Sequence, residues 1–128
     1  MTYLIDTQLA IWTLFDDPHL SQEAREILDE SGNRFQFSVC SIWEISIKRG
    51  LNKAGFQHDP REIRRYLMRN GCEELTIQSK HAVEVELLPP IHKDPFDRIL
   101  IAQAKVEGIT LLTSDAVVAQ YPGPIRKV

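Results

Sequence analysis

The sequence contains only two cysteines, Cys40 and Cys72, and they do not form a CxxC pair. One long-range bridge is therefore the only disulfide that the chain could form within itself. Such a bridge would be an unusual addition to a domain with this much hydrophobic sequence. We expect two buried thiols in a protein of the reducing cytoplasm.

Histidines are also few, and their spacing matches no zinc-binding pattern. We therefore assign no zinc site. We expect all four histidines to lie on the surface or in loops: His19, His58, His81 and His92.

Long hydrophobic runs are missing as well. The longest apolar stretch near the start, residues 3–15, is interrupted by Asp6, Thr7 and Gln8, and no basic segment precedes it. It matches neither a signal peptide nor a transmembrane helix, so we expect no membrane partner.

The chain has no excess of positive charge. Its 15 lysines and arginines are outnumbered by 18 aspartates and glutamates, which gives a net charge of −3 and a pI of about 5.8. These values argue against a nucleic-acid binder that relies on bulk electrostatics. A nuclease stays compatible with them, because an acidic centre lowers the net charge while a local basic rim attracts phosphates.

What the sequence does contain is an alternation of strand-like and helix-like segments. Its 128 residues, 43% of them hydrophobic, predict one compact domain with a substantial core. The alternation predicts an α/β fold with right-handed crossovers and a parallel sheet that is covered on both faces. The predicted strands are residues 2–5, 34–39, 74–77, 109–112 and 125–128, and the main predicted helices are 9–15, 21–31, 41–48, 60–70, 79–87 and 94–107.

Four acidic residues follow strand-like runs or lie near the start of a helix: Asp6, Glu44, Asp97 and Asp115. In a parallel sheet these positions share one edge, so the four carboxylates are expected to lie together. Two carboxylates about 4 Å apart repel each other by roughly 4 kcal/mol at an effective dielectric constant near 20. The cluster therefore needs a cation, and Mg²⁺ or Mn²⁺ suits oxygen ligands best.

Asp97 has the most informative surroundings. We expect Asp94 to cap the following helix and Pro95 to occupy its first position. Asp97 then lies in the first turn, where an acid that only complements the helix dipole contributes about 0.3 to 1 kcal/mol. It also precedes Leu100 and Ile101 by three and four positions, on the stripe that faces the core. A carboxylate in that direction requires a partner, which favours a functional role.

The other three acids have structural alternatives. Asp6 and Asp115 are suitable helix N-caps, and Glu44 is the last residue of a capping-box pattern that begins at Ser41. These alternatives do not remove the predicted cluster, because strand ends and the helix starts that follow them occupy the same edge of the sheet.

Hydroxyl and basic side chains accompany the acids. Thr7, Thr113 and Ser114 are candidates for orienting the carboxylates or a bound water. The basic side chains either cover solvated helix faces or form a rim for RNA or a partner protein. The rim candidates are Lys48, Arg49, Arg61 and Arg65.

The order of these motifs resembles that of PIN-domain ribonucleases, and in particular the VapC toxins of bacterial toxin–antitoxin pairs. The resemblance covers nearly the whole chain and implies a single PIN domain over residues 1–128, with a three-layer α/β/α fold and a mainly parallel sheet of four or five strands. It further implies a homodimer, dependence on Mg²⁺ or Mn²⁺, and inhibition by a cognate antitoxin. One position differs, since Gln8 stands where many relatives carry histidine. The motifs are Tyr3-Leu4-Ile5-Asp6-Thr7, Ser41-Ile42-Trp43-Glu44, residues 92–102, and Thr113-Ser114-Asp115.

These observations lead to the hypothesis of metal-assisted hydrolysis of RNA. Asp6 and Asp97 would bind the ion, Glu44 would bind it or activate the attacking water, and Asp115 would complete the site directly or through water. The alternatives are an RNA-processing PIN nuclease that is not a toxin, a phosphoryl-transfer domain, and a catalytically silent module that binds RNA or protein. The sequence leaves open which RNA is cleaved.

Overall fold

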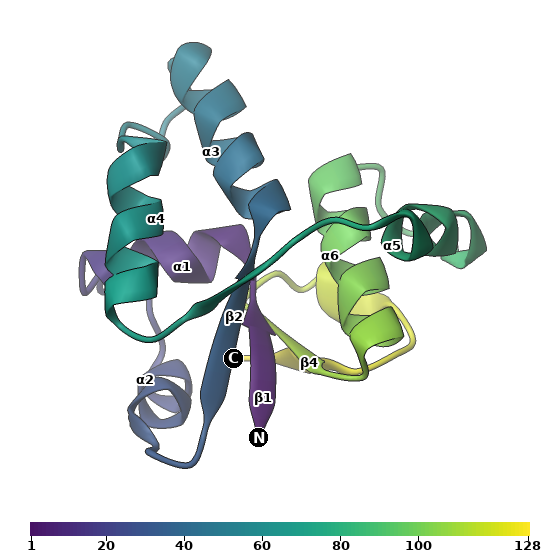
Figure 1. Ribbon diagram of the computed structural model, residues 1–128, viewed down its shortest axis with the longest axis horizontal. Coiled ribbons are helices and arrows are strands. Elements are labelled where there is room, and N and C mark those ends of the chain that lie inside the picture. The colour runs from purple at the N-terminus through teal and green to yellow at the C-terminus, as the bar shows by residue number, and fades with distance from the viewer.

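The structure, a computed structural model, describes residues 1–128 and contains a five-stranded sheet of order β3-β2-β1-β4-β5. All four neighbouring pairs of strands are parallel, as predicted. In Figure 1 the sheet runs through the centre of the molecule. The strands are β1 (Thr2–Ile5), β2 (Arg34–Ser38), β3 (Glu73–Leu75), β4 (Thr110–Thr113) and β5 (Ile125–Lys127).

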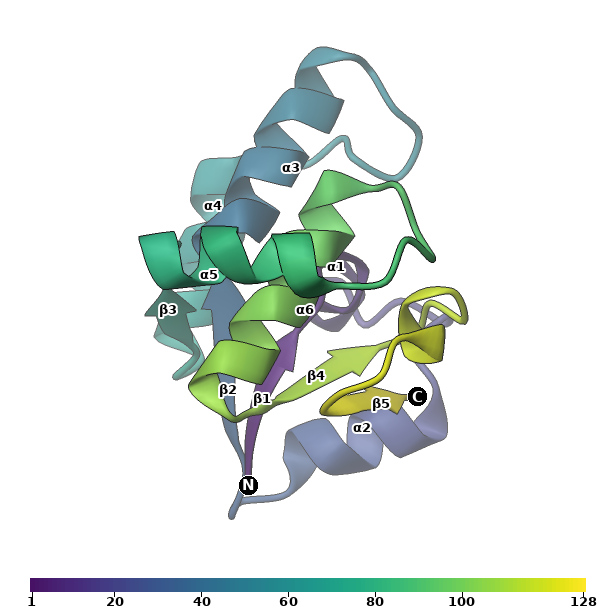
Figure 2. The same cartoon turned by 90° about the vertical axis from the view of Figure 1, so that its right-hand side faces the viewer.

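The helices cover both faces of the sheet, which confirms the three-layer α/β/α prediction (Figures 1 and 2). The first four pack on one face, and α5, α6 and the first of two 3₁₀ turns pack on the other. None of these helices combines the length and the apolar composition that a bilayer span requires. They are α1 (Thr7–Leu14), α2 (Gln22–Asp29), α3 (Val39–Gly50), α4 (Pro60–Arg69), α5 (Ser79–Glu84), α6 (Pro95–Glu107), and the 3₁₀ turns η1 (Val85–Leu87) and η2 (Val118–Gln120).

Two hydrophobic cores result from the alternation of side chains along the strands. Tyr3 and Ile5 of β1 face the core beneath α1 to α4, whereas Leu4 faces the core beneath α6. In β4, Leu112 faces the core beneath α1 to α4, and Leu111 faces the core beneath α6. β1 and β4 are therefore buried on both faces, which explains their mainly apolar sequences.

Helix α6 shows how local sequence sets an element's limits. The Asp94 carboxylate accepts a hydrogen bond from the Phe96 backbone N–H at 2.9 Å, and Pro95 occupies the first helical position. Gly108 ends the helix at φ 69°, a left-handed conformation that glycine adopts without steric cost. These features confirm the predicted start and end of the helix.

The predicted start of α3, at residue 41, was two residues too late. The helix begins at Val39, and its N-cap is Ser38, whose hydroxyl accepts a hydrogen bond from the Cys40 N–H at 3.0 Å. β2 pairs with β1 as far as Phe37 and with β3 as far as Ser38, so the helix starts as soon as the strand ends. The third strand is also displaced, to Glu73–Leu75 from the predicted residues 74–77.

The prediction that all histidines lie on the surface or in loops was wrong for His81. This residue is fully buried in α5, where its Nδ1 accepts a hydrogen bond from the Gln78 N–H and its Nε2 lies 3.1 Å from Glu107 Oε2. Burial is tolerated because both ring nitrogens have partners. Both cysteines are free thiols, but only Cys40 is fully buried, and Cys72 is half-buried.

Candidate functional site

A cavity of about 380 Å³ lies beyond the carboxyl ends of β1 and β4. The strand order reverses between these two strands, and open parallel sheets place their ligands at such a point. Residues that begin α1, residues of α3 and α6, and the segment after β4 form the walls. Five of its eleven lining residues are acids, namely Asp6, Glu44, Asp94, Asp97 and Asp115.

Asp6 is both a helix cap and a wall of the cavity. Its Oδ1 accepts a hydrogen bond from the Leu9 N–H at 2.8 Å, and its Oδ2 accepts one from the Thr113 hydroxyl at 2.5 Å. Asp6 is only 6% exposed. This burial raises the pKa of its carboxyl to about 6, although the hydrogen bond from Thr113 lowers the pKa. Asp6 therefore caps α1 and at the same time lines the cavity.

Glu44 extends from α3 into the same cavity and is 5% exposed. Its Oε2 binds the Lys48 ammonium at 2.5 Å, whereas its Oε1 is buried without a hydrogen-bond partner. The capping-box alternative is wrong, because Ser41 lies inside the helix and its hydroxyl accepts a hydrogen bond from the Thr7 hydroxyl at 2.9 Å. Glu44 thus has no capping role that would explain its burial.

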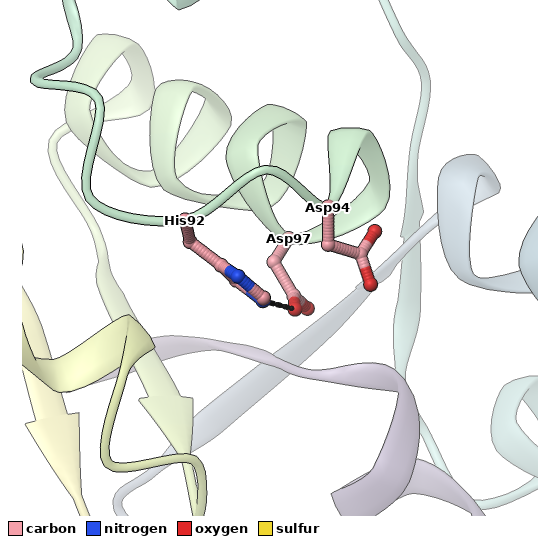
Figure 3. Close-up of side chains that lie close together, drawn as sticks. All are labelled: His92, Asp94 and Asp97. Atoms are coloured by element: carbon pink, nitrogen blue, oxygen red, sulfur yellow. Dashed lines mark hydrogen bonds and ion pairs between the residues drawn. The ribbon is translucent and has the colours of Figure 1, made fainter.

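Asp97 lies in the first turn of α6 beside Asp94 and His92 (Figure 3). Its Oδ2 is 2.9 Å from His92 Nε2. Burial, followed by the negative charge of Asp94, raises the pKa of Asp97 to about 6, while the His92 hydrogen bond opposes this shift. The anionic form of Asp97 is therefore poorly stabilised by the protein alone.

Asp115 follows β4 and is half-buried. Its Oδ1 accepts hydrogen bonds from the N–H groups of Val117 and Val118 at 2.7 and 3.3 Å, and its own N–H donates to the Thr113 hydroxyl oxygen at 3.0 Å. Thr113 therefore connects Asp115 to Asp6. Ser114, another predicted supporting residue, also lines the cavity.

The structure brings all four predicted acids to one cavity. Only Asp97 of the four belongs to a tight cluster of possible metal ligands. The one set of three side chains whose possible ligand atoms all lie within 4.8 Å of one another is His92, Asp94 and Asp97. Sequence reasoning missed His92, because it compared histidines with one another for zinc spacing. The signal that could have found His92 is its position five residues before Asp97, which was already predicted to be functional.

The donor set fits a divalent cation. Five carboxylates face the cavity, and Lys48 is the one lysine or arginine among the lining residues. The buried Glu44 Oε1 lacks a partner, and such an atom costs free energy unless something binds it. Carboxylate oxygens are the ligands that Mg²⁺ and Mn²⁺ prefer, so these residues suit either ion.

The predicted basic rim is not one surface. Lys48 lies inside the cavity, paired with Glu44. Arg49 and Arg61 both pair with Asp59, at 3.7 and 3.2 Å. Arg65 lines a separate hollow of about 330 Å³ next to Phe15 and Tyr66. Of the four rim candidates, only Lys48 therefore lies at the acidic cavity.

Comparison with known proteins supports the fold. The family described as PIN domain matches residues 3–124. No curated protein matches the chain.

Solved structures resemble the chain over nearly its whole length. A structure of VapBC2 from Rickettsia felis bound to a promoter DNA fragment has a TM-score of 0.72 at 16% identity, covering 99% of this chain and 98% of that one. DNA-bound VapBC from Salmonella typhimurium has a TM-score of 0.65 at 19% identity and the same coverage. VapBC-1 from nontypeable Haemophilus influenzae has a TM-score of 0.61 at 17% identity, covering 94% and 91%. At these identities the likeness shows a shared fold.

Proposed function

The match over residues 3–124 means that the chain belongs to the PIN-domain family, and on this premise we propose that it is a ribonuclease dependent on Mg²⁺ or Mn²⁺. PIN domains are nucleases, so hydrolysis of nucleic acid is the activity expected at the level of the family. The observation that carries the proposal is the cavity with five carboxylates, in which the buried Glu44 Oε1 has no partner.

The residues divide into those that hold the ion and those that act on water. Asp6 and Asp97 would hold it directly, and Asp115 would do so directly or through water. A divalent cation bound there offsets negative charge on the phosphate and makes a water molecule more acidic. Thr113 orients both Asp6 and Asp115, and the Thr7 hydroxyl joins the start of α1 to α3.

Glu44 is suited to accept the proton of the attacking water. Lys48 holds Oε2 at 2.5 Å, which leaves Oε1 as the oxygen that takes the proton. The water oxygen then bonds to phosphorus, and the bond from phosphorus to the leaving oxygen breaks. The leaving oxygen takes a proton from solvent water, and Glu44 later releases the proton that it accepted to the solvent, so the carboxylate is restored. Lys48 also places one positive charge in the wall of the cavity, where it would attract the phosphate.

Removal of divalent ions is expected to abolish cleavage of RNA by the purified protein. The carboxylates repel a phosphate unless a cation lies between them. The experiment compares labelled RNA incubated with Mg²⁺, with Mn²⁺ or with excess EDTA, followed by addition of Mn²⁺ beyond the chelator. Cleavage that continues undiminished in EDTA would overturn this function.

We further propose that the enzyme is the toxin of a toxin–antitoxin pair, acts in the cytoplasm as a homodimer, and is inhibited by a cognate antitoxin. The support is the motif resemblance to VapC toxins and the similarity of fold to three structures described as VapBC. The same site would also serve an RNA-processing PIN nuclease that is not a toxin. Growth arrest on induced expression, relieved by the neighbouring gene, separates the two.

Divalent ions are also expected to stabilise the protein against unfolding. Ions that bind only the folded state add RT ln(1 + [L]/Kd), which is about 2.7 kcal/mol at 100 times the Kd. Thermal melts with MnCl₂ are compared with melts in NaCl of equal ionic strength. A catalytically silent module that only binds RNA or protein should show no difference between the two salts.

A further inference from the structure

The segment from η1 to α6 is held in place by Arg98. Its Nη1 donates to the Pro89 and His92 carbonyl oxygens at 3.0 and 3.4 Å, and its Nη2 donates to those of Val85 and Leu88 at 3.1 and 3.4 Å. Arg98 forms no salt bridge, and its guanidinium donates mainly to these backbone carbonyls. One side chain therefore fixes the path of the chain just before the site.

Tyr121 fixes the backbone of His92 from the other side. Its hydroxyl accepts hydrogen bonds from the His92 N–H at 2.7 Å and from Arg98 Nη1 at 3.0 Å, and it donates to the His92 carbonyl oxygen at 3.1 Å. The donor and both acceptor positions of this hydroxyl are thus occupied. Tyr121 is 4% exposed, so water does not compete strongly for these bonds.

The consequence is a fixed position for the imidazole against Asp97. His92 Nε2 lies 2.9 Å from Asp97 Oδ2 (Figure 3). Both side chains are partly buried, with 27% and 19% exposure. Asp97 Oδ1 takes part in no hydrogen bond within the protein. The arrangement thus occupies one oxygen of Asp97 and leaves the other for a ligand in the cavity.

The geometry points to His92 as a positioning residue for Asp97: Arg98 and Tyr121 hold the histidine, and its Nε2–H holds Oδ2 so that Oδ1 binds the cation. This inference rests on the proposed function, because it assumes that the cavity binds a divalent ion. Hydrogen-bond partners of ligating carboxylates orient these ligands, and their loss costs roughly 10- to 100-fold in metal affinity.

The test is the affinity of the metal-free protein for Mn²⁺, measured by titration calorimetry without RNA. His92→Ala is expected to raise the Kd for Mn²⁺ roughly 10- to 100-fold. His92→Gln should restore most of the affinity, because its amide N–H reaches the same oxygen. Tyr121→Phe should weaken binding in the same direction, and His19→Ala, outside the cavity, should leave the Kd unchanged. Circular dichroism confirms that each variant is folded.

A spectroscopic measurement separates positioning from direct ligation. If His92 acts through Asp97, electron spin-echo spectra of bound Mn²⁺ should show no nitrogen directly coordinated to the ion. A directly bound nitrogen that disappears in His92→Ala would overturn the inference, as would an unchanged Kd in that variant.

The outcomes also distinguish this inference from the proposed function. If wild-type protein binds Mn²⁺ and His92→Ala binds it more weakly, yet neither cleaves RNA, only the ribonuclease proposal fails. If wild type cleaves RNA and His92→Ala has the wild-type affinity for Mn²⁺, only the positioning role fails. Absence of Mn²⁺ binding by wild type overturns both.

Discussion

Replacement of Asp97 by asparagine is expected to reduce the rate of RNA cleavage about a thousandfold, which corresponds to roughly 4 kcal/mol of lost transition-state stabilisation. The amide keeps the size of the carboxylate and an oxygen that accepts the His92 hydrogen bond. It loses the negative charge that attracts a divalent ion. The change therefore removes the electrostatics of the site and leaves its shape.

The same variant is expected to be more stable than wild type in the absence of metal. Burial and the nearby Asp94 charge raise the pKa of Asp97 to about 6, so the folded state disfavours the anion. Above this pH wild type folds with a poorly stabilised charge, and the neutral amide avoids that cost. A loss of activity together with a higher melting temperature would show that the carboxylate serves function at the expense of stability.

Single-turnover cleavage of end-labelled RNA and thermal melts in EDTA measure the two effects. Asp29→Asn is the matched control, since Asp29 is an exposed acid at the end of α2 that does not line the cavity. It should cleave RNA at the wild-type rate. Cleavage by Asp97→Asn within tenfold of wild type would remove Asp97 from the proposed mechanism.

Phe37→Ala is expected to lower the free energy of unfolding by about 3 to 5 kcal/mol. The Phe37 side chain is fully buried in β2, within the core beneath α1 to α4. Its truncation removes apolar contacts and leaves a cavity that the surrounding helices fill only in part.

Urea denaturation followed by circular dichroism gives the free energies. Phe15→Ala is the matched control, because Phe15 is 49% exposed and its main aromatic contact is the ring of His58. We expect the control to lose at most about 1 kcal/mol. A loss for Phe37→Ala that is no larger than the loss for Phe15→Ala would contradict the assignment of Phe37 to the core.

Features that depend on neighbouring residues were predicted well from sequence. The Asp94-Pro95 start of α6 and its Gly108 end involve contacts between residues a few positions apart. The start of α3 was misplaced for the opposite reason. It depends on where β2 stops pairing with β1, and that pairing joins Ile5 to Phe37 across 32 positions. The capping-box pattern at Ser41 predicted a helix start from local sequence alone. The end of β2 instead places the start at Val39, so Ser41 lies inside the helix.

In the acidic site, too, some features could be predicted from local sequence and others depend on residues far apart in the chain. The alternation of apolar strands and helices was sufficient to predict that Asp6, Glu44, Asp97 and Asp115 share one edge of a parallel sheet. It did not predict that Lys48 lies inside the cavity or that Arg49 and Arg61 turn away to Asp59. The directions of long side chains depend on which charges the folded chain places within reach.

The sequence by itself determined the α/β class, the parallel sheet and the edge at which the carboxylates gather, because hydrophobic periodicity and helix caps act over a few residues. Only the tertiary structure decided which side chains hold those carboxylates. The Thr113 hydroxyl reaches Asp6 from 107 positions away, and Tyr121 fixes His92 from 29 positions away. Such contacts exist only after the strands have paired and the helices have packed, so no local pattern encodes them.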